Sequence, residues 1–210
     1  MRPRAAMLTT LLMAGVLGLS NARALDKEPA VFATPQAAFD AAVKASKAKD
    51  FKAFAAVFTP ESQAKLAGQL AGLGVMFKAF SAFDKEGKMK DKLADLDKIM
   101  DKHGLTKDVM GKLKQTKAPK EIEANNKVIA DAVKDKPAFV GDVMKWLDAA
   151  NPGKNKGGPL DEATLEGVTI TGDKATGTVV TKEKKEPMEF AKVGGGWRIV
   201  LSEPKAKEKK

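Results

Sequence analysis

The sequence contains no cysteine and no tyrosine, and its only histidine is His103. Without cysteine the chain forms no disulfide and offers neither a lipid-attachment site nor the thiolate ligands of structural zinc sites. One histidine cannot assemble the common zinc sets, so only carboxylates remain as metal ligands. The absence of tyrosine removes a common buried proton donor. The residues typical of acid-base catalysis are therefore scarce, and stability must come from packing alone.

The first 24 residues have the pattern of a secretory signal peptide. Arg2 and Arg4 form a basic start, residues 7–19 form an apolar run, and the Ala-Arg-Ala tripeptide at 22–24 supplies the small residues that a signal peptidase recognises. The run is shorter than the roughly 20 apolar residues that span a bilayer, which argues against an uncleaved anchor. We therefore expect cleavage after Ala24, export to the periplasm or extracellular space, and no transmembrane span in the mature protein.

Positive charge is in excess, and lysine carries almost all of it. The formal net charge of +10 falls to +7 when Arg2, Arg4 and Arg23 leave with the predicted signal peptide, and Arg198 is then the only arginine. Lysine is a strongly hydrated point charge, whereas recognition of phosphate or carboxylate by paired hydrogen bonds favours arginine. The composition therefore permits weak binding to an anionic surface and argues against a specific nucleic-acid site.

Residues 165–201 are the only part of the sequence with the pattern of a β-sheet. Apolar side chains alternate with polar ones within each expected strand. Gly172-Asp173, the polar 182–187 segment and the glycines at 194–196 are expected to form the turns of an antiparallel meander. The side chains predicted to face the interior are Val168, Ile170, Met188, Phe190 and Ile199.

Helices are expected ahead of the strands. Thr34-Pro35 and Thr59-Pro60 each place a capping side chain before a proline at the first helical position, and Asp50 is a third cap. Phenylalanines such as Phe39 and Phe54 recur on the apolar sides of these helices. Because burying each one stabilises the fold by roughly 1.5–3 kcal/mol, they are expected in the core.

The remaining segments complete the predicted organisation. Residues 62–150 are expected to form about five more helices joined by short loops, as in antiparallel neighbours. The 151–159 segment, NPGKNKGGP, is the predicted linker to the strands of 160–203. The charged 204–210 tail is expected to be disordered. The predicted fold class is α+β: a single domain over 25–203, with N-terminal helices packed on a C-terminal antiparallel meander and a multi-helix insertion between them.

No pattern in the sequence indicates a catalytic or metal site. His103 precedes a glycine that is expected to end a helix, so its expected role is interaction with the last helical carbonyls. Aspartates recur one helical turn apart in the 91–101 segment and could share a hard cation, but the lysines between them favour an ion-paired, solvated surface. We therefore assign no catalytic residue, no metal ligand and no cofactor.

Two stretches resemble the nuclear transport factor two-like superfamily, which includes ketosteroid isomerase. They are residues 34–62, TPQAAFDAAVKASKAKDFKAFAAVFTPES, and residues 172–201, GDKATGTVVTKEKKEPMEFAKVGGGWRIVL. The resemblance implies a curved sheet wrapped around a pocket by the first helices. Enzyme members place acids, tyrosine or histidine in that pocket, whereas the inward positions here are apolar, so the resemblance is to an exported, non-enzymatic member with a helical insertion. The pocket residues it implies are Phe39, Phe54, Phe58, Met188, Phe190 and Trp197.

Three functions follow from these observations. The first is an exported, non-catalytic binding or structural protein that holds a small apolar ligand or an envelope protein partner. The second is an isomerase-like or cyclase-like enzyme that uses a buried carboxylate, Asp40 or Glu189, with a raised pKa. The third is a binder of anionic envelope polymer through lysine-rich helix faces and the 205–210 tail. The apolar inward positions favour the first.

Overall fold

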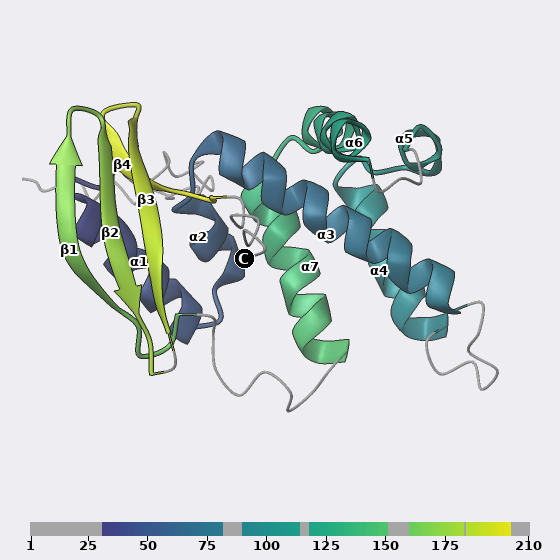
Figure 1. The fold of residues 1–210 in the computed structure, drawn as a ribbon. Helices are drawn as coiled ribbons and strands as arrows, with labels where there is room; N and C mark the ends of the chain where they lie inside the picture. Colours follow the sequence, from purple (N-terminus) through teal and green to yellow (C-terminus); the bar gives the residue numbers. More distant parts are fainter. Residues whose placement is uncertain (1–30, 82–89, 114–117, 151–159, 183, 203–210) are drawn as a thin grey trace, which may run out of the picture.

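The computed structural model describes residues 31–81, 90–113, 118–150, 160–182 and 184–202. Within these residues the chain forms seven helices followed by four strands (Figure 1). The helices are α1 (Pro35–Lys47), α2 (Phe51–Ala56), α3 (Pro60–Ser81), α4 (Lys90–Lys102), α5 (Lys107–Gly111), α6 (Pro119–Ala132) and α7 (Lys136–Ala150). The strands are β1 (Thr164–Thr171), β2 (Lys174–Val180), β3 (Lys185–Val193) and β4 (Gly196–Val200). The fold is α+β, as the sequence predicts.

The first three helices begin at the predicted caps. The Thr34 hydroxyl accepts a hydrogen bond from the backbone N–H of Ala37 at 3.1 Å, and the Asp50 carboxylate caps α2 in the same way. The third helix begins at Pro60, slightly earlier than expected, because the Thr59 hydroxyl already accepts an N–H of the first turn at 3.2 Å. A side-chain cap followed by proline therefore fixes this start.

The four strands form one antiparallel sheet in sequence order, which is the predicted meander. The residues just after α2 pair with β4 and so extend the sheet at this edge. The Ile199 N–H donates to the Val57 carbonyl at 3.0 Å, and the Thr59 N–H donates to the Ile199 carbonyl at 2.9 Å. At the start of β4, the Trp197 N–H donates to the Phe32 carbonyl at 2.8 Å. Segments far away in the sequence thus cover one edge of the sheet.

The predicted interior positions of β1 are wrong. The pairing of β1 with β2 shifts between Glu166 and Thr169, where Gly167 has a φ of +62°. This bulge inserts one residue and reverses the alternation of side chains. Val168 is consequently 36% exposed, and Ile170, near the uncovered end of an edge strand, is 54% exposed.

The sheet and α1 enclose a core that we call the sheet-lobe core. Phe39 of α1 and Trp197 of β4 both belong to it and are 1% and 5% exposed. Phe190 and Ile199 are each 1% exposed in the same core, and Met188 packs against it, as the strand pattern predicts. The N-terminal helices and the C-terminal strands therefore share one interior.

A second core lies among α3, α4, α6 and α7, which with α5 form what we call the helical lobe. This lobe lies beside the sheet, while α1 lies behind the sheet in the view of Figure 1. Leu66 of α3 packs against both cores. Helix α7 lies between α2 and α4 (Figure 1). None of the helices in the described ranges is both long and apolar enough to cross a bilayer.

Candidate ligand-binding groove

The predicted pocket residues lie together in the sheet-lobe core. The rings of Phe54 and Phe58 meet edge to face with their centroids 5.3 Å apart, and Phe54 and Met188 are only partly buried. The other four side chains are at least nine-tenths buried: Phe39, Phe58, Phe190 and Trp197. The structure thus brings all six residues together as packing side chains of one interior, and their role in ligand binding stays a prediction.

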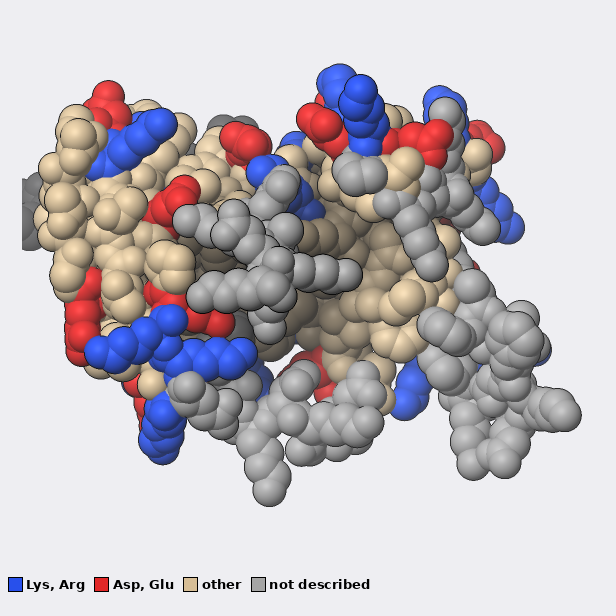
Figure 2. Space-filling view, viewed as in Figure 1, with Lys and Arg blue, Asp and Glu red and all other residues tan. Residues whose placement is uncertain are grey.

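The carboxylates of the enzymatic hypothesis lie on the surface. Asp40 is exposed on α1, where it accepts a hydrogen bond from the Gln36 amide at 2.9 Å. Glu189 is exposed on β3, in register with Thr176 of β2. Glu189 lies on the face of the sheet that is turned away from α1, and most of this face between its two ends carries no charged side chains (Figure 2). Neither acid is buried, whereas the enzymatic hypothesis requires a buried carboxylate.

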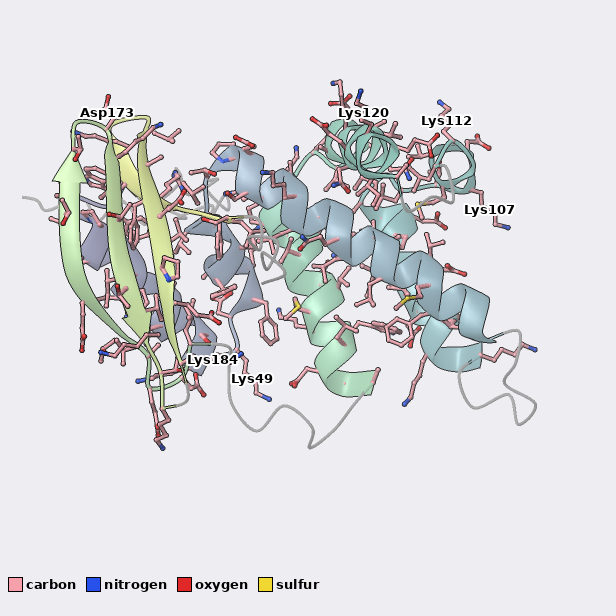
Figure 3. The ribbon with its side chains drawn as sticks, viewed as in Figure 1. Lys49, Lys107, Lys112, Lys120, Asp173 and Lys184 are labelled. Atoms are coloured by element: carbon pink, nitrogen blue, oxygen red, sulfur yellow. The ribbon has the colours of Figure 1, made fainter. Side chains whose placement is uncertain are left out.

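The lysines of the polymer-binding hypothesis are distributed over the surface. Lys107, Lys112 and Lys120 project away from α5 and α6 (Figure 3). Other lysines form ion pairs with neighbouring carboxylates, such as Lys127 with Asp131 at 3.0 Å. The 205–210 tail of that hypothesis lies outside the described residues. Mixed charges of this kind describe an ordinary solvated helix surface.

His103 lies at the end of α4, as predicted, but its ring contacts another helix. Gly104 follows with a φ of +87° and ends the helix. The His103 Nε2 atom is 2.9 Å from the Asp142 Oδ2 atom of α7, and the ring meets Phe139 edge to face at 5.5 Å. The imidazole is only 8% exposed. His103 therefore connects α4 to α7, a partner that the local sequence does not reveal.

A groove of about 450 Å³ lies between α4 and α7, close to this contact. Its apolar lining comes from Ile99 of α4 and from Trp146 and Ala149 of α7. The groove is shallow and largely open to solvent, so a ligand would contact it along one side. The charged side chains that line it are Lys98, Lys102, Asp142 and Lys145.

The indole of Trp146 is held in place from two sides. Its Nε1–H donates a hydrogen bond to the Lys92 carbonyl of α4 at 2.8 Å. Its ring meets Phe77 of α3 edge to face, with centroids 5.6 Å apart and planes at 79°. Such aromatic pairs stabilise a fold by roughly 0.5–1.5 kcal/mol in addition to the stabilisation that comes from burying their surface. The groove therefore has a preformed aromatic wall.

Two of the three lysines in the groove are already paired. The Lys102 Nζ atom donates to Asp142 Oδ2 at 2.7 Å, and the Lys98 Nζ atom donates to Asp95 at 2.8 Å. Lys145 is exposed and has no carboxylate partner among the residues that the structure describes. As far as the structure describes the chain, Lys145 is thus the cation of the groove that no carboxylate neutralises.

Asp142 stays ionised in this setting. Partial burial alone would raise the pKa of its carboxyl, but the hydrogen bonds from Lys102 and His103, and the charges of both groups, outweigh the burial and lower the pKa. An acid with a lowered pKa is a poor proton donor near neutral pH. Asp142 therefore acts as a fixed negative charge at one side of the groove.

No protein family model matches the chain. Comparison with curated proteins and with solved structures likewise gives no match. The described residues contain no group of three or more His, Cys, Asp or Glu side chains placed to hold a metal ion. The resemblance to the nuclear transport factor two-like superfamily therefore stays a prediction.

Proposed function

We propose that the protein is an exported, non-catalytic binding protein that holds a small molecule with an apolar body in the groove between α4 and α7. The single observation that carries this proposal is the groove itself, with a volume of about 450 Å³ and a wall formed by Trp146 and Ile99. Export is inferred from the signal-peptide pattern of residues 1–24, which lies outside the described residues.

The chemistry of the groove favours binding over catalysis. Efficient proton transfer needs a group with a pKa close to the working pH. The carboxylate of the groove, Asp142, instead has a lowered pKa because Lys102 and His103 hydrogen-bond to it. The neighbouring cations are lysines on the solvent side of the helices. These groups suit electrostatic attraction of a ligand rather than its chemical conversion.

Blocking the groove tests the proposal directly. Ala149 is exposed at its rim, so Ala149→Phe fills the groove without changing the buried core. Ala124 is exposed on α6, away from the groove, so Ala124→Phe is the matched control. Binding of 1-octanol is measured by calorimetry, and the fold of each variant by circular dichroism.

We expect 1-octanol to bind the native protein and the Ala124→Phe variant equally well. Ala149→Phe should weaken binding at least tenfold, since the added ring takes the place of the ligand. Equal binding by all three proteins, or no binding to the native protein, would overturn the proposal.

A further inference from the structure

The three lysines that line the groove differ in whether a carboxylate already pairs with them. Asp142 engages Lys102 at 2.7 Å, and Asp95 engages Lys98 at 2.8 Å. Lys145 faces the same groove from α7 without an acidic partner among the described residues. Within the described part of the chain, the groove therefore presents one positive charge without a carboxylate partner, beside an apolar wall.

We infer that the ligand is an amphiphile with a single negative charge, whose chain lies along Trp146 and Ile99 and whose head group pairs with Lys145. This inference rests on the proposed binding function and adds the class of the head group. A cationic head group at the same place would be repelled by the ammonium group of Lys145. A neutral head group would leave Lys145 without a partner.

Among the described residues that line the groove, no unpaired cation remains to meet a second negative charge on the ligand. Lys102 and Lys98 already pair with Asp142 and Asp95, and like charges close together repel. Asp142 cannot readily turn away, because His103 also bonds to its Oδ2 atom at 2.9 Å from a ring that is only 8% exposed. The α4–α7 contact thus keeps the Asp142 carboxylate paired with Lys102 at the groove.

Four ligands with the same octyl chain test this charge preference. They are 1-octanol, octanoate, octyltrimethylammonium and octyl phosphate at pH 8, where a phosphate monoester with a second pKa of about 6 carries close to two charges. We expect octanoate to bind about two- to fivefold more tightly than 1-octanol, the range of an exposed ion pair. Octyl phosphate should bind no more tightly than octanoate, and the cationic ligand should bind more weakly than 1-octanol.

Substitutions assign the effect to individual charges. Lys145→Met keeps the apolar stem but removes the charge, so it should abolish the advantage of octanoate over 1-octanol, measured as the ratio of the two affinities in the same variant. Lys134→Met, at an exposed lysine that does not line the groove, is the matched control and should keep the advantage. Asp142→Asn and Asp95→Asn release Lys102 and Lys98, so each should raise the affinity for octyl phosphate relative to octanoate. Asp95→Asn also leaves the contact between His103 and Asp142 intact, so its effect on ligand binding reports the change in charge without a loss of packing between α4 and α7.

The inference fails if octanoate binds no more tightly than 1-octanol, or if Lys145→Met weakens both ligands equally. It also fails if both aspartate variants leave the ratio of octyl phosphate to octanoate affinity unchanged. A result in which 1-octanol and octanoate both fail to bind would instead overturn the proposed binding function. The two failures are therefore distinguishable in one set of titrations.

Discussion

The guanidinium of Arg198 donates a hydrogen bond from Nη1 to the backbone carbonyl of Ala56 at 2.6 Å. Arg198 lies on β4, and Ala56 is the last residue of α2, so the bond joins the sheet to the helix that packs on α7. The arginine is 8% exposed, and burial lowers the pKa of its guanidinium. A cation at the carboxyl end of a helix also interacts favourably with the helix dipole.

Replacing Arg198 should destabilise the protein. Arg198→Met removes the donor and leaves the Ala56 carbonyl without this partner, which we expect to lower the free energy of unfolding by about 1–3 kcal/mol. The exposed Lys192→Met on β3 serves as the control and should change it by less than about 0.5 kcal/mol. Urea denaturation measures both values. Equal stability of the two variants would contradict a structural role for Arg198.

The close approach of α2 and α7 should be sensitive to one added methyl group. A Cβ atom at Gly141 would lie 3.0 Å from both the Cβ and the backbone N atoms of Lys52. We expect Gly141→Ala to destabilise the protein by roughly 1–3 kcal/mol, because backbone cannot move aside cheaply. Gly72→Ala in α3 meets nothing within 4 Å and should instead stabilise by about 0.5–1 kcal/mol. Thermal unfolding of both variants checks the predicted opposite signs.

The hydroxyl of Ser62 should matter more than its size suggests. It is 2% exposed, accepts a hydrogen bond from the Leu201 N–H at 2.9 Å and lies 2.7 Å from the Thr59 hydroxyl. Ser62→Ala leaves these groups without this partner, at an expected cost of about 1–3 kcal/mol. Ser202→Ala, at an exposed position, should be nearly neutral. Chemical denaturation compares the two, and a neutral Ser62→Ala would show that water replaces the hydroxyl.

The free energy of unfolding should decrease in acid because two carboxylates become protonated. They are Asp142 in α7 and Asp135, which caps the start of α7. For Asp142, burial raises the pKa but hydrogen bonds from Lys102 and His103 outweigh it and lower the pKa below 3.8. For Asp135, burial likewise raises the pKa, and the Ala138 N–H and Lys52 outweigh it. A lowered folded-state pKa stabilises the fold above the unfolded-state value, and this stabilisation is lost as pH falls through the folded-state pKa.

Urea titrations between pH 6 and pH 2 check this dependence, a window that brackets the ordinary value near 4. The native protein should lose stability as pH falls below this value, and Asp142→Asn should lose less over the same interval. Asp131→Asn, at an exposed aspartate of α6, should behave like the native protein. A native-like pH dependence in Asp142→Asn would show that this carboxylate does not contribute.

Most of the local structure follows from short stretches of sequence. The Thr34 and Asp50 caps and the glycine turn at Gly104 each depend on neighbours within a few residues, and all three lie where expected. The strand order also follows, because short turns allow only neighbouring strands to pair. The side of the sheet to which each β1 side chain points does not follow from the local sequence, because the bulge at Gly167 depends on how β1 pairs with β2.

The sequence does not predict the groove between α4 and α7, because the groove also depends on how distant segments pack. Helical periodicity predicts an apolar stripe on α4 and another on α7 but not which parts of their edges stay open between them. Lys98 and Lys102 beside Ile99, and Lys145 beside Trp146, were the only local signal, and alternating charges on a helix surface are common. The strand and helix patterns instead predict a pocket among side chains that pack together in the sheet-lobe core.

Caps, turns and side-chain periodicity act over a few residues, so the α+β class, the helix starts and the meander can be predicted from the sequence. The contacts of His103 and Lys102 with Asp142, about 40 residues further along the chain, arise from the packing of α4 against α7. This packing forms the groove. It also makes Trp146 and Ile99 line this groove and leaves Lys145 without an acidic partner among the described residues. These relationships depend on how whole helices pack against one another, which no local pattern specifies.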